Sequence, residues 1–229
     1  MSELVNYQLD GKIATVTLSN GKVNALSPEL IEQLNSVLDQ VEAAEATLVL
    51  TGSPGILSGG YDLRVMGAGV EAAVALVSAG SALSRRLLAF PTPVVVACAG
   101  HAIAKGAFLL LSADLRIAAE GDFKIGLNEV AIGMTMHHAG IALARGRLTP
   151  AAFERAVVLA EMMSPQQAQI AGFVDQLVPA DKVLEVAQQA AAALTQLSMK
   201  AHHQTKLKAR VALLEELDRA IELDKQHLQ

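Results

Sequence analysis

The chain has 229 residues, of which 52% are hydrophobic and 18% charged, and its formal net charge is −5. This negative charge argues against nucleic-acid binding, since phosphate recognition needs clustered positive charge. The single cysteine, Cys98, excludes an internal disulfide. No apolar run reaches membrane-spanning length, and the N-terminus lacks the features of a signal peptide. We therefore expect a soluble cytoplasmic protein whose apolar excess lines subunit contacts.

The first predicted elements are a hairpin, a helix and a strand. Residues 4–18 alternate apolar and polar side chains around a central Asp-Gly turn, which predicts a β-hairpin. Ser27 and Pro28 are typical of a helix start, and apolar residues recur at helical spacing over residues 30–41. Residues 46–53 are then predicted to form a short buried strand.

The middle of the chain repeats this alternation. A glycine-containing loop leads into an alanine-rich helix that is predicted to end near Leu88. Residues 91–100 follow as a strand, with prolines that keep it from starting early. Another helix comes next, then a strand over residues 115–119, and a strand and loop over residues 123–134. Such alternation predicts an α/β fold with a mixed or parallel sheet.

The last third is predicted to be mainly helical. Thr149 and Ser164 each precede a proline and open a helix, and Gln167 completes a capping box in the second. We interpret residues 1–180 as a core and residues 181–229 as a helical region of the same structural unit.

Two strand-to-helix junctions carry the most informative pattern. Each runs from a strand through small residues into a helix: "LVLTGSPGILSGGYDL" (48–63) and "VVVACAGHAIAKGAFLLL" (94–111). Such turns leave peptide N–H groups unpaired, and two facing turns would form an oxyanion hole with two donors. Neither segment matches a phosphate-binding loop, because Gly-Lys-Ser/Thr and GxGxxG are both missing. Taken singly, each glycine-rich turn is more commonly just a connection between a strand and a helix.

Five collinear segments resemble the crotonase superfamily, the enoyl-CoA hydratases and isomerases, from about Val5 to Val186. They are "KVNALSPEL", "LSGGYDL", "GHAIAKGAFLLLSADLRIA", "GLNEVAIGM" and "SPQQAQIAGFVDQLVP". Within the superfamily, the sequence most resembles the monofunctional Δ3,Δ2-enoyl-CoA isomerases, whose corresponding loop also has the sequence Gly-Leu-Asn-Glu. The resemblance implies a crotonase-like spiral of β-β-α units, with a helical C-terminal region that assembles homotrimers or hexamers.

The resemblance also implies a set of catalytic groups. The thioester carbonyl of an acyl-CoA would lie between the backbone N–H groups of Tyr61 and Lys105, each worth roughly 2.7–4 kcal/mol of transition-state stabilisation. Glu129 would transfer the proton. Without the surrounding motif, Glu129 would be read as a solvated loop acid.

Coenzyme A would bind as part of the substrate, with no permanently bound cofactor and no metal implied. Its phosphates would lie near Lys22, and its adenine and pantetheine near two short backbone segments. We expect these segments to contribute Val23, Ala25, Gly59, Gly60, Tyr61, Asp62 and Leu63, with Asp62 shaping the loop rather than reacting.

One position separates isomerase from hydratase. Hydratases of the superfamily carry two glutamates, because adding water needs one group for the water and one for the α-proton. Phe108 occupies the first of these positions, and Glu129 keeps the second. One carboxylate suffices to shift a double bond, and an apolar Phe108 nearby would raise the pKa of Glu129. The isomerase is therefore favoured. Hydration, thioester hydrolysis, decarboxylation and a CoA-binding pseudoenzyme remain alternatives.

Lys105 departs from the glycine that the superfamily carries there. One hypothesis is that its ammonium reaches a CoA phosphate or the enolate; the other is a tolerated substitution in a weakened or redirected enzyme. A cation at a helix N-terminus is unfavourable, so Lys105 is a poor choice for folding alone.

The acyl pocket is expected to be formed by Met66, Phe108, Met134 and His137. His137 or His138 is a candidate second acid or base, although such pairs more often pack or face solvent. The basic stretch 200–210 is either a solvated helix face or an interface or CoA-phosphate contact.

Overall fold

Two β-sheets organise the computed structural model, which describes residues 3–227. The larger sheet has the strand order β1-β2-β3-β5-β7-β9 and the smaller one β4-β6-β8. The strands are β1 (Val5–Asp10), β2 (Ile13–Leu18), β3 (Thr47–Thr51), β4 (Gly55–Ser58), β5 (Val94–Cys98), β6 (Gly100–Ile103), β7 (Leu115–Ala119), β8 (Ile125–Gly126) and β9 (Gln176–Val178).

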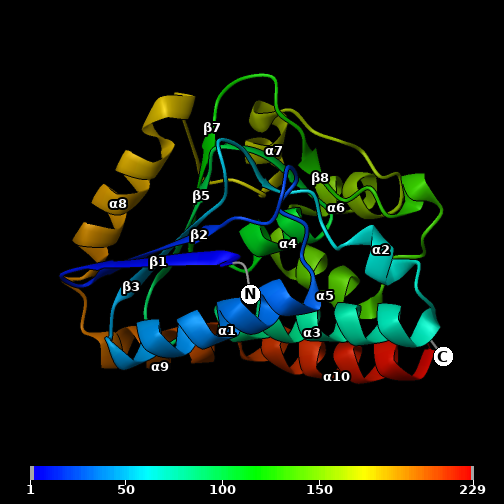
Figure 1. The fold of residues 1–229 in the computed structure, drawn as a ribbon, viewed down its shortest axis with the longest axis horizontal. Coiled ribbons are helices and arrows are strands. Elements are labelled where there is room, and N and C mark those ends of the chain that lie inside the picture. Colours follow the sequence, from blue (N-terminus) through cyan, green and yellow to red (C-terminus); the bar gives the residue numbers. More distant parts are fainter. Residues whose placement is uncertain (1–2, 228–229) are drawn as a thin grey trace.

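Helices follow the strands along the chain and then dominate its last third (Figure 1). They are α1 (Pro28–Ala43), α2 (Leu63–Met66), α3 (Val70–Leu88), α4 (Lys105–Leu111), α5 (His138–Arg147), α6 (Pro150–Val157), α7 (Pro165–Ala171), α8 (Val183–Leu194), α9 (Met199–Ala209) and α10 (Val211–His227), with two short 3-10 helices, η1 (Val130–Ile132) and η2 (Ala180–Lys182).

The two sheets are built in parallel by the same units. β3 continues into β4, β5 into β6 and β7 into β8, so each turn of the chain adds one strand to each sheet. Apart from the antiparallel β1–β2 hairpin, the paired strands within each sheet are parallel. This spiral of strand pairs and helices confirms the predicted crotonase-like α/β fold.

The central strands β3, β5 and β7 of the large sheet are buried on both faces, which explains their continuous apolar sequence. Every residue of β5 is buried. On one face, Val183, Ala187 and Ala191 of α8 pack against β3, β5 and β7. On the other face, α1, α3 and α4 contribute to the main core. In Figure 1, α8 stands apart from the layer that contains α1, α3, α9 and α10.

The three predicted helix starts at Ser27, Thr149 and Ser164 are present, and a side chain caps two of them, whereas Thr149 precedes α6 without a capping hydrogen bond. Ser27 accepts the Leu30 N–H at the start of α1. Ser164 and Gln167 form the expected capping box of α7. Six short elements differ from the expectations: β4 and β6 lie in segments expected to be a loop and a turn, η1 lies in an expected loop, η2 lies within the expected helical region, and α5 and β9 lie where no element is expected. No helix in residues 3–227 is both long and apolar enough to cross a membrane.

Candidate functional site

A largely apolar cavity of about 720 Å³ opens between α2, α3 and the segment around η1. It contains three of the residues expected in a substrate pocket, Met66, Met134 and His137, together with Tyr61 and Glu129. Its other lining residues are Leu63, Gly67, Gly69, Val70, Ala73, Val74, Val77, Ile132 and Thr135. Most of the wall from α3 was not singled out from the sequence, although its i, i+3 and i+4 spacing is that of one helix face.

The Tyr61 peptide is held at the cavity by a short parallel bridge to Leu26. Leu26 donates its N–H to the Gly60 carbonyl (2.8 Å), and Asp62 donates its N–H to the Leu26 carbonyl (3.0 Å). In a parallel pairing the intervening residue directs its own N–H away from the partner strand. The Tyr61 N–H therefore points away from Leu26.

Lys105 is the first residue of α4, so its peptide N–H has no partner within the helix. The preceding Ala104 has φ +52° and ψ −119°, and its side chain provides no cap. A non-glycine residue at positive φ is strained, and the surrounding structure must hold it there. This strain sets the direction of the turn that presents the Lys105 N–H.

The two peptides come close because Gly60 lacks a side chain. Gly60 has φ +104°, and a Cβ there would lie 2.9 Å from the Ala104 Cβ and 3.5 Å from the Lys105 nitrogen. The structure thus brings together the Gly60-Tyr61 turn and the N-terminus of α4, 44 residues apart in the chain by their numbers. Within residues 3–227 neither the Tyr61 nor the Lys105 N–H has an acceptor, and two such donors near each other suit an oxygen that gains negative charge.

The Lys105 side chain points into the protein, whereas the first hypothesis placed its ammonium near a CoA phosphate or the enolate. Lys105 is only 2% exposed, and its ammonium donates to the Gly80 carbonyl (2.5 Å) and to the Ser84 hydroxyl on α3. Burial lowers the pKa of Lys105 to about 7. The ammonium therefore does not reach outward to a CoA phosphate, and it is not part of the cavity wall.

Glu129 is the only carboxylate that lines the cavity among the described residues. It immediately precedes η1, where its carbonyl accepts the N–H groups of Ile132 and Met134. One carboxylate oxygen, Oε2, is buried without a hydrogen-bond partner in residues 3–227. Burial raises the pKa of Glu129 to about 7, which suits a group that must take and return a proton near neutral pH.

Phe108 does not line the cavity, contrary to expectation. It is 1% exposed and belongs to the hydrophobic core. The His137 ring packs edge-on against it, with centroids 5.5 Å apart. The imidazole of His137 therefore separates Phe108 from the cavity, because the cavity wall includes His137 and not Phe108.

His137 occupies a site held in place from the C-terminal helix. Asp224 of α10 accepts the backbone N–H groups of His138 (2.7 Å) and Ala139 (2.9 Å), which begin α5. Burial lowers the pKa of His137 to about 4. The imidazole is therefore neutral at pH 7.

The two segments expected to bind coenzyme A lie side by side. The Gly59 N–H donates to the Val23 carbonyl (2.8 Å), and Lys22 is exposed beside them. Asp62 accepts the Arg64 N–H and forms an ion pair with the Arg64 side chain, whose hydrogen bond lowers the pKa of Asp62. Asp62 therefore shapes the start of α2.

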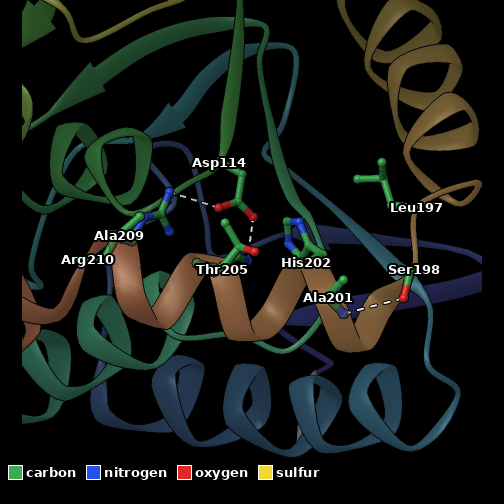
Figure 2. Close-up of a pocket in the computed structure, with 9 residues that line it drawn as sticks. Asp114, Leu197, Ser198, Ala201, His202, Thr205, Ala209 and Arg210 are labelled. Carbon is green, nitrogen blue, oxygen red and sulfur yellow. Dashed lines mark hydrogen bonds and ion pairs between the residues drawn. The ribbon is translucent and has the colours of Figure 1, made fainter.

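A second cavity, of about 470 Å³, lies over α9 and is lined mainly by the basic stretch 200–210, but by none of the residues expected in the active site (Figure 2). Asp114 points toward α9, where it pairs with Arg210 (2.9 Å) and with Lys206 (2.6 Å). Lys206 also donates to the carbonyls of Phe90 and Thr92. The charges of Asp114, Lys206 and Arg210 are therefore paired with one another, and these ion pairs anchor α9 to the core.

Comparisons with known proteins agree with this arrangement. A sequence model of the enoyl-CoA hydratase/isomerase family matches residues 8–229. The structure is similar to an enoyl-CoA hydratase/isomerase family protein from Pseudomonas syringae, with a TM-score of 0.97 and 57% identity over 99% of this chain and 98% of that one. It is also similar to a Mycobacterium tuberculosis protein that one solved structure names an enoyl-CoA isomerase, with a TM-score of 0.95 and 38% identity over 99% of this chain and 100% of that one. A second solved structure names the same protein a probable enoyl-CoA hydratase, with a TM-score of 0.93 and 38% identity over 96% and 94%.

A curated relative bears a different name. A probable enoyl-CoA hydratase of Bacillus subtilis is 34% identical over 140 residues, which are 59% of this chain. The matched part spans only 54% of that relative's length.

Proposed function

Because the chain belongs to the enoyl-CoA hydratase/isomerase family, we propose that it moves the double bond of an enoyl-CoA thioester from position 3 to position 2. The observation that carries this proposal is the single buried carboxylate, Glu129, in a cavity of otherwise mainly apolar lining. In this proposal coenzyme A enters as part of the substrate, along Lys22 and the backbone at residues 23–25 and 59–63.

The reaction begins with proton removal from C2. The ionised Glu129 takes this proton, and the electrons of the C2–H bond move into the thioester carbonyl to form an enolate. The N–H groups of Tyr61 and Lys105 donate to the enolate oxygen. Glu129 then returns the proton to C4, and the double bond settles between C2 and C3. Proton and electrons balance, because one group both accepts and donates.

The surroundings of Glu129 support its part in this scheme. A carboxylate with an ordinary pKa is a weak base at pH 7, whereas a pKa of about 7 lets it take and return a proton with similar ease. The apolar wall from α3 makes the surroundings of Glu129 less polar, which strengthens the hydrogen bonds that the enolate would accept.

Conjugation of 3-enoyl-CoA thioesters tests the proposal. The purified protein is incubated with a series of chain lengths, and the conjugated 2-enoyl product is followed by its ultraviolet absorbance. We expect wild type to form this product and Glu129→Gln to lose at least about 100-fold in kcat, since general acid–base catalysis contributes about 10²–10⁴. Gln keeps the size and shape of Glu but carries an amide, which neither accepts nor returns a proton near neutral pH.

The products distinguish this reaction from its rivals. Formation of 3-hydroxyacyl-CoA would indicate hydration, and free CoA would indicate thioester hydrolysis. Tight binding of acyl-CoA with no turnover at any chain length would leave a binding protein. Any of these results in place of conjugation would overturn the isomerase proposal.

Hydration is the second candidate, supported by a neutral imidazole in the same cavity. His137 lines the cavity with Glu129, so it is placed to accept a hydrogen bond from a water molecule. The name of the B. subtilis relative favours this candidate as well. Against it stands the pKa of about 4, which makes His137 a weak base.

A further inference from the structure

The Lys105 side chain has no part in the proposed reaction. It connects two elements of the site, α4 and α3. From the first turn of α4 it reaches α3, where it donates to the Gly80 carbonyl (2.5 Å) and the Ser84 hydroxyl. Gly80 and Ser84 are four residues apart, so they lie one above the other on the same face of the helix. The ammonium thus joins the start of α4 to a single turn of α3.

Tyr61 reaches the same turn of α3 from the opposite loop. A Cβ at Gly80 would lie 2.1 Å from the Tyr61 hydroxyl oxygen, so the absence of a side chain at Gly80 makes room for the ring. The Tyr61 hydroxyl also donates to the Val77 carbonyl (3.4 Å). Tyr61 and Lys105 are the residues whose peptide N–H groups bind the thioester oxygen in the proposed reaction. The side chains of both therefore bind to the same part of α3, residues 77–84.

Folding by itself does not require a lysine at this place. A cation at the first position of a helix opposes the helix dipole, and burying an ammonium costs free energy. A methionine of similar length would fill the same volume without either cost. It would also leave no orphan acceptor, because Gly80 accepts the Ser84 N–H within α3 and the Ser84 hydroxyl is free to bond back to the Gly80 carbonyl.

We propose that Lys105 is a positioning residue, whose side chain ties the N-terminus of α4 to Gly80 and Ser84. This connection keeps the N–H groups of Lys105 and Tyr61 at the spacing needed to bind one thioester oxygen. The proposal rests on the proposed function, since both require a polarised thioester carbonyl. It concerns the side chain, whereas the reaction itself uses only the peptide N–H.

Lys105→Met tests the connection. We expect kcat to fall about 10- to 100-fold, because a donor displaced by less than 1 Å loses much of its effect in the transition state. KM should change by less than about threefold, since the substrate is held mainly elsewhere. The midpoint of thermal unfolding should stay equal or rise, since a buried charge is removed. A merely structural lysine would lower stability instead.

A spectroscopic measurement reports on the donors without turnover. Hexanoyl-CoA with a ¹³C-labelled carbonyl has no double bond to shift, and its carbonyl stretch falls in frequency when hydrogen bonds polarise it. Infrared difference spectra of the bound ligand should show this fall in wild type and in Glu129→Gln. In Lys105→Met the fall should be at most about half as large, because one of two donors is misplaced.

Two serines of α3 provide a matched pair of variants. Ser84→Ala removes one acceptor of the ammonium, and we expect a smaller fall in kcat of about 3- to 10-fold. Ser78→Ala removes a buried hydroxyl of the same helix that has no partner in residues 3–227, and its kcat should equal wild type. This pair keeps the test usable even where Lys105→Met folds poorly.

The outcomes separate this proposal from the proposed function. If Lys105→Met keeps the full carbonyl shift and wild-type kcat, the positioning role is wrong while the reaction stands. If wild type conjugates nothing but shifts the carbonyl, and Lys105→Met reduces that shift, the isomerase is wrong and the positioning role is supported. No carbonyl shift in wild type overturns both, because the thioester then has no oxyanion hole.

Discussion

Glu129 is 7% exposed, and one of its oxygens has no hydrogen-bond partner within residues 3–227. Burial makes the charged form of such a carboxylate less stable than its neutral form, and this difference raises the pKa of Glu129. Its loop is recognisable in the sequence, and the expected direction of the pKa shift is correct, but the expected cause is wrong, because Phe108 lies behind His137 and does not line the cavity with Glu129. The burial that produces the shift comes from the loop around η1 and from the wall of α3, which join only in the folded chain.

The titration of Glu129 predicts a pH-dependent stability difference. In the unfolded chain Glu129 ionises near its ordinary pKa of 4.5, whereas in the folded protein it stays neutral to about pH 7. Wild type therefore loses stability relative to the non-titrating Glu129→Gln as pH rises through this window. Between pH 4 and pH 8 the difference in unfolding free energy should move by about 2–3 kcal/mol in favour of Gln.

Urea unfolding of both proteins at pH 4, 6 and 8 measures this difference. Other titrating groups cancel, because they are common to the two chains. A constant difference across the three pH values would mean that Glu129 titrates normally, and the proposed general base would then lack its tuning.

At the scale of elements, two turns and one helix decide where the donors lie. The turns were predicted from small residues after strands, because a helix start always leaves N–H groups unpaired. Their meeting depends on the spiral, which places β4 and β6 next to each other in the small sheet and so brings Gly60 to Ala104. The role of α3 as the wall and anchor of this site was not predicted, since its apolar face looks like that of any core helix.

Gly60→Ala should damage this meeting of the two turns. The added Cβ would lie 2.9 Å from the Ala104 Cβ, and alanine would be strained at φ +104°. We expect a loss of about 1–3 kcal/mol in unfolding free energy, together with a fall in kcat of at least about 100-fold. Thermal unfolding and the conjugation assay measure the two effects.

Gly133→Ala serves as the control for backbone strain. Gly133 has a similar positive φ of +81°, but a Cβ there meets nothing within 4 Å. If Gly60→Ala and Gly133→Ala lose activity equally, backbone strain alone would account for the loss, and the close approach to Ala104 would be irrelevant.

At the scale of the whole molecule, the C-terminal helices α9 and α10 pack against the core and fix the position of one side of the site. Asp224 of α10 caps α5 and so places His137, while Lys206 and Arg210 fix α9 to the core through Asp114. Large apolar side chains stay exposed on this region, including Leu197, Leu207 and Val211. They support the proposal that the chain assembles as a homotrimer or hexamer, which its resemblance to the crotonase superfamily implied.

Lys206→Met separates anchoring from catalysis. The variant leaves the buried carbonyls of Phe90 and Thr92 without a donor, so we expect a loss of about 2–4 kcal/mol in unfolding free energy. The kcat per folded molecule should remain within about twofold of wild type, because the second cavity lies apart from Glu129. The exposed Lys208→Met on the same helix should change neither quantity. A fall in kcat at unchanged stability would instead assign the cavity over α9 a part in the reaction.

The sequence by itself determined the alternation of strands and helices and the two glycine-containing turns, while its resemblance to the crotonase superfamily implied the β-β-α spiral and drew attention to Glu129 and Phe108. The alternation and the turns are local features, because strand periodicity, helix caps and unpaired N–H groups depend on neighbours along the chain. The tertiary structure alone decided that the Lys105 ammonium turns inward to α3, that His137 covers Phe108, and that Glu129 is buried. A side chain's direction and its pKa depend on which distant elements pack around it, and that packing follows from the whole spiral.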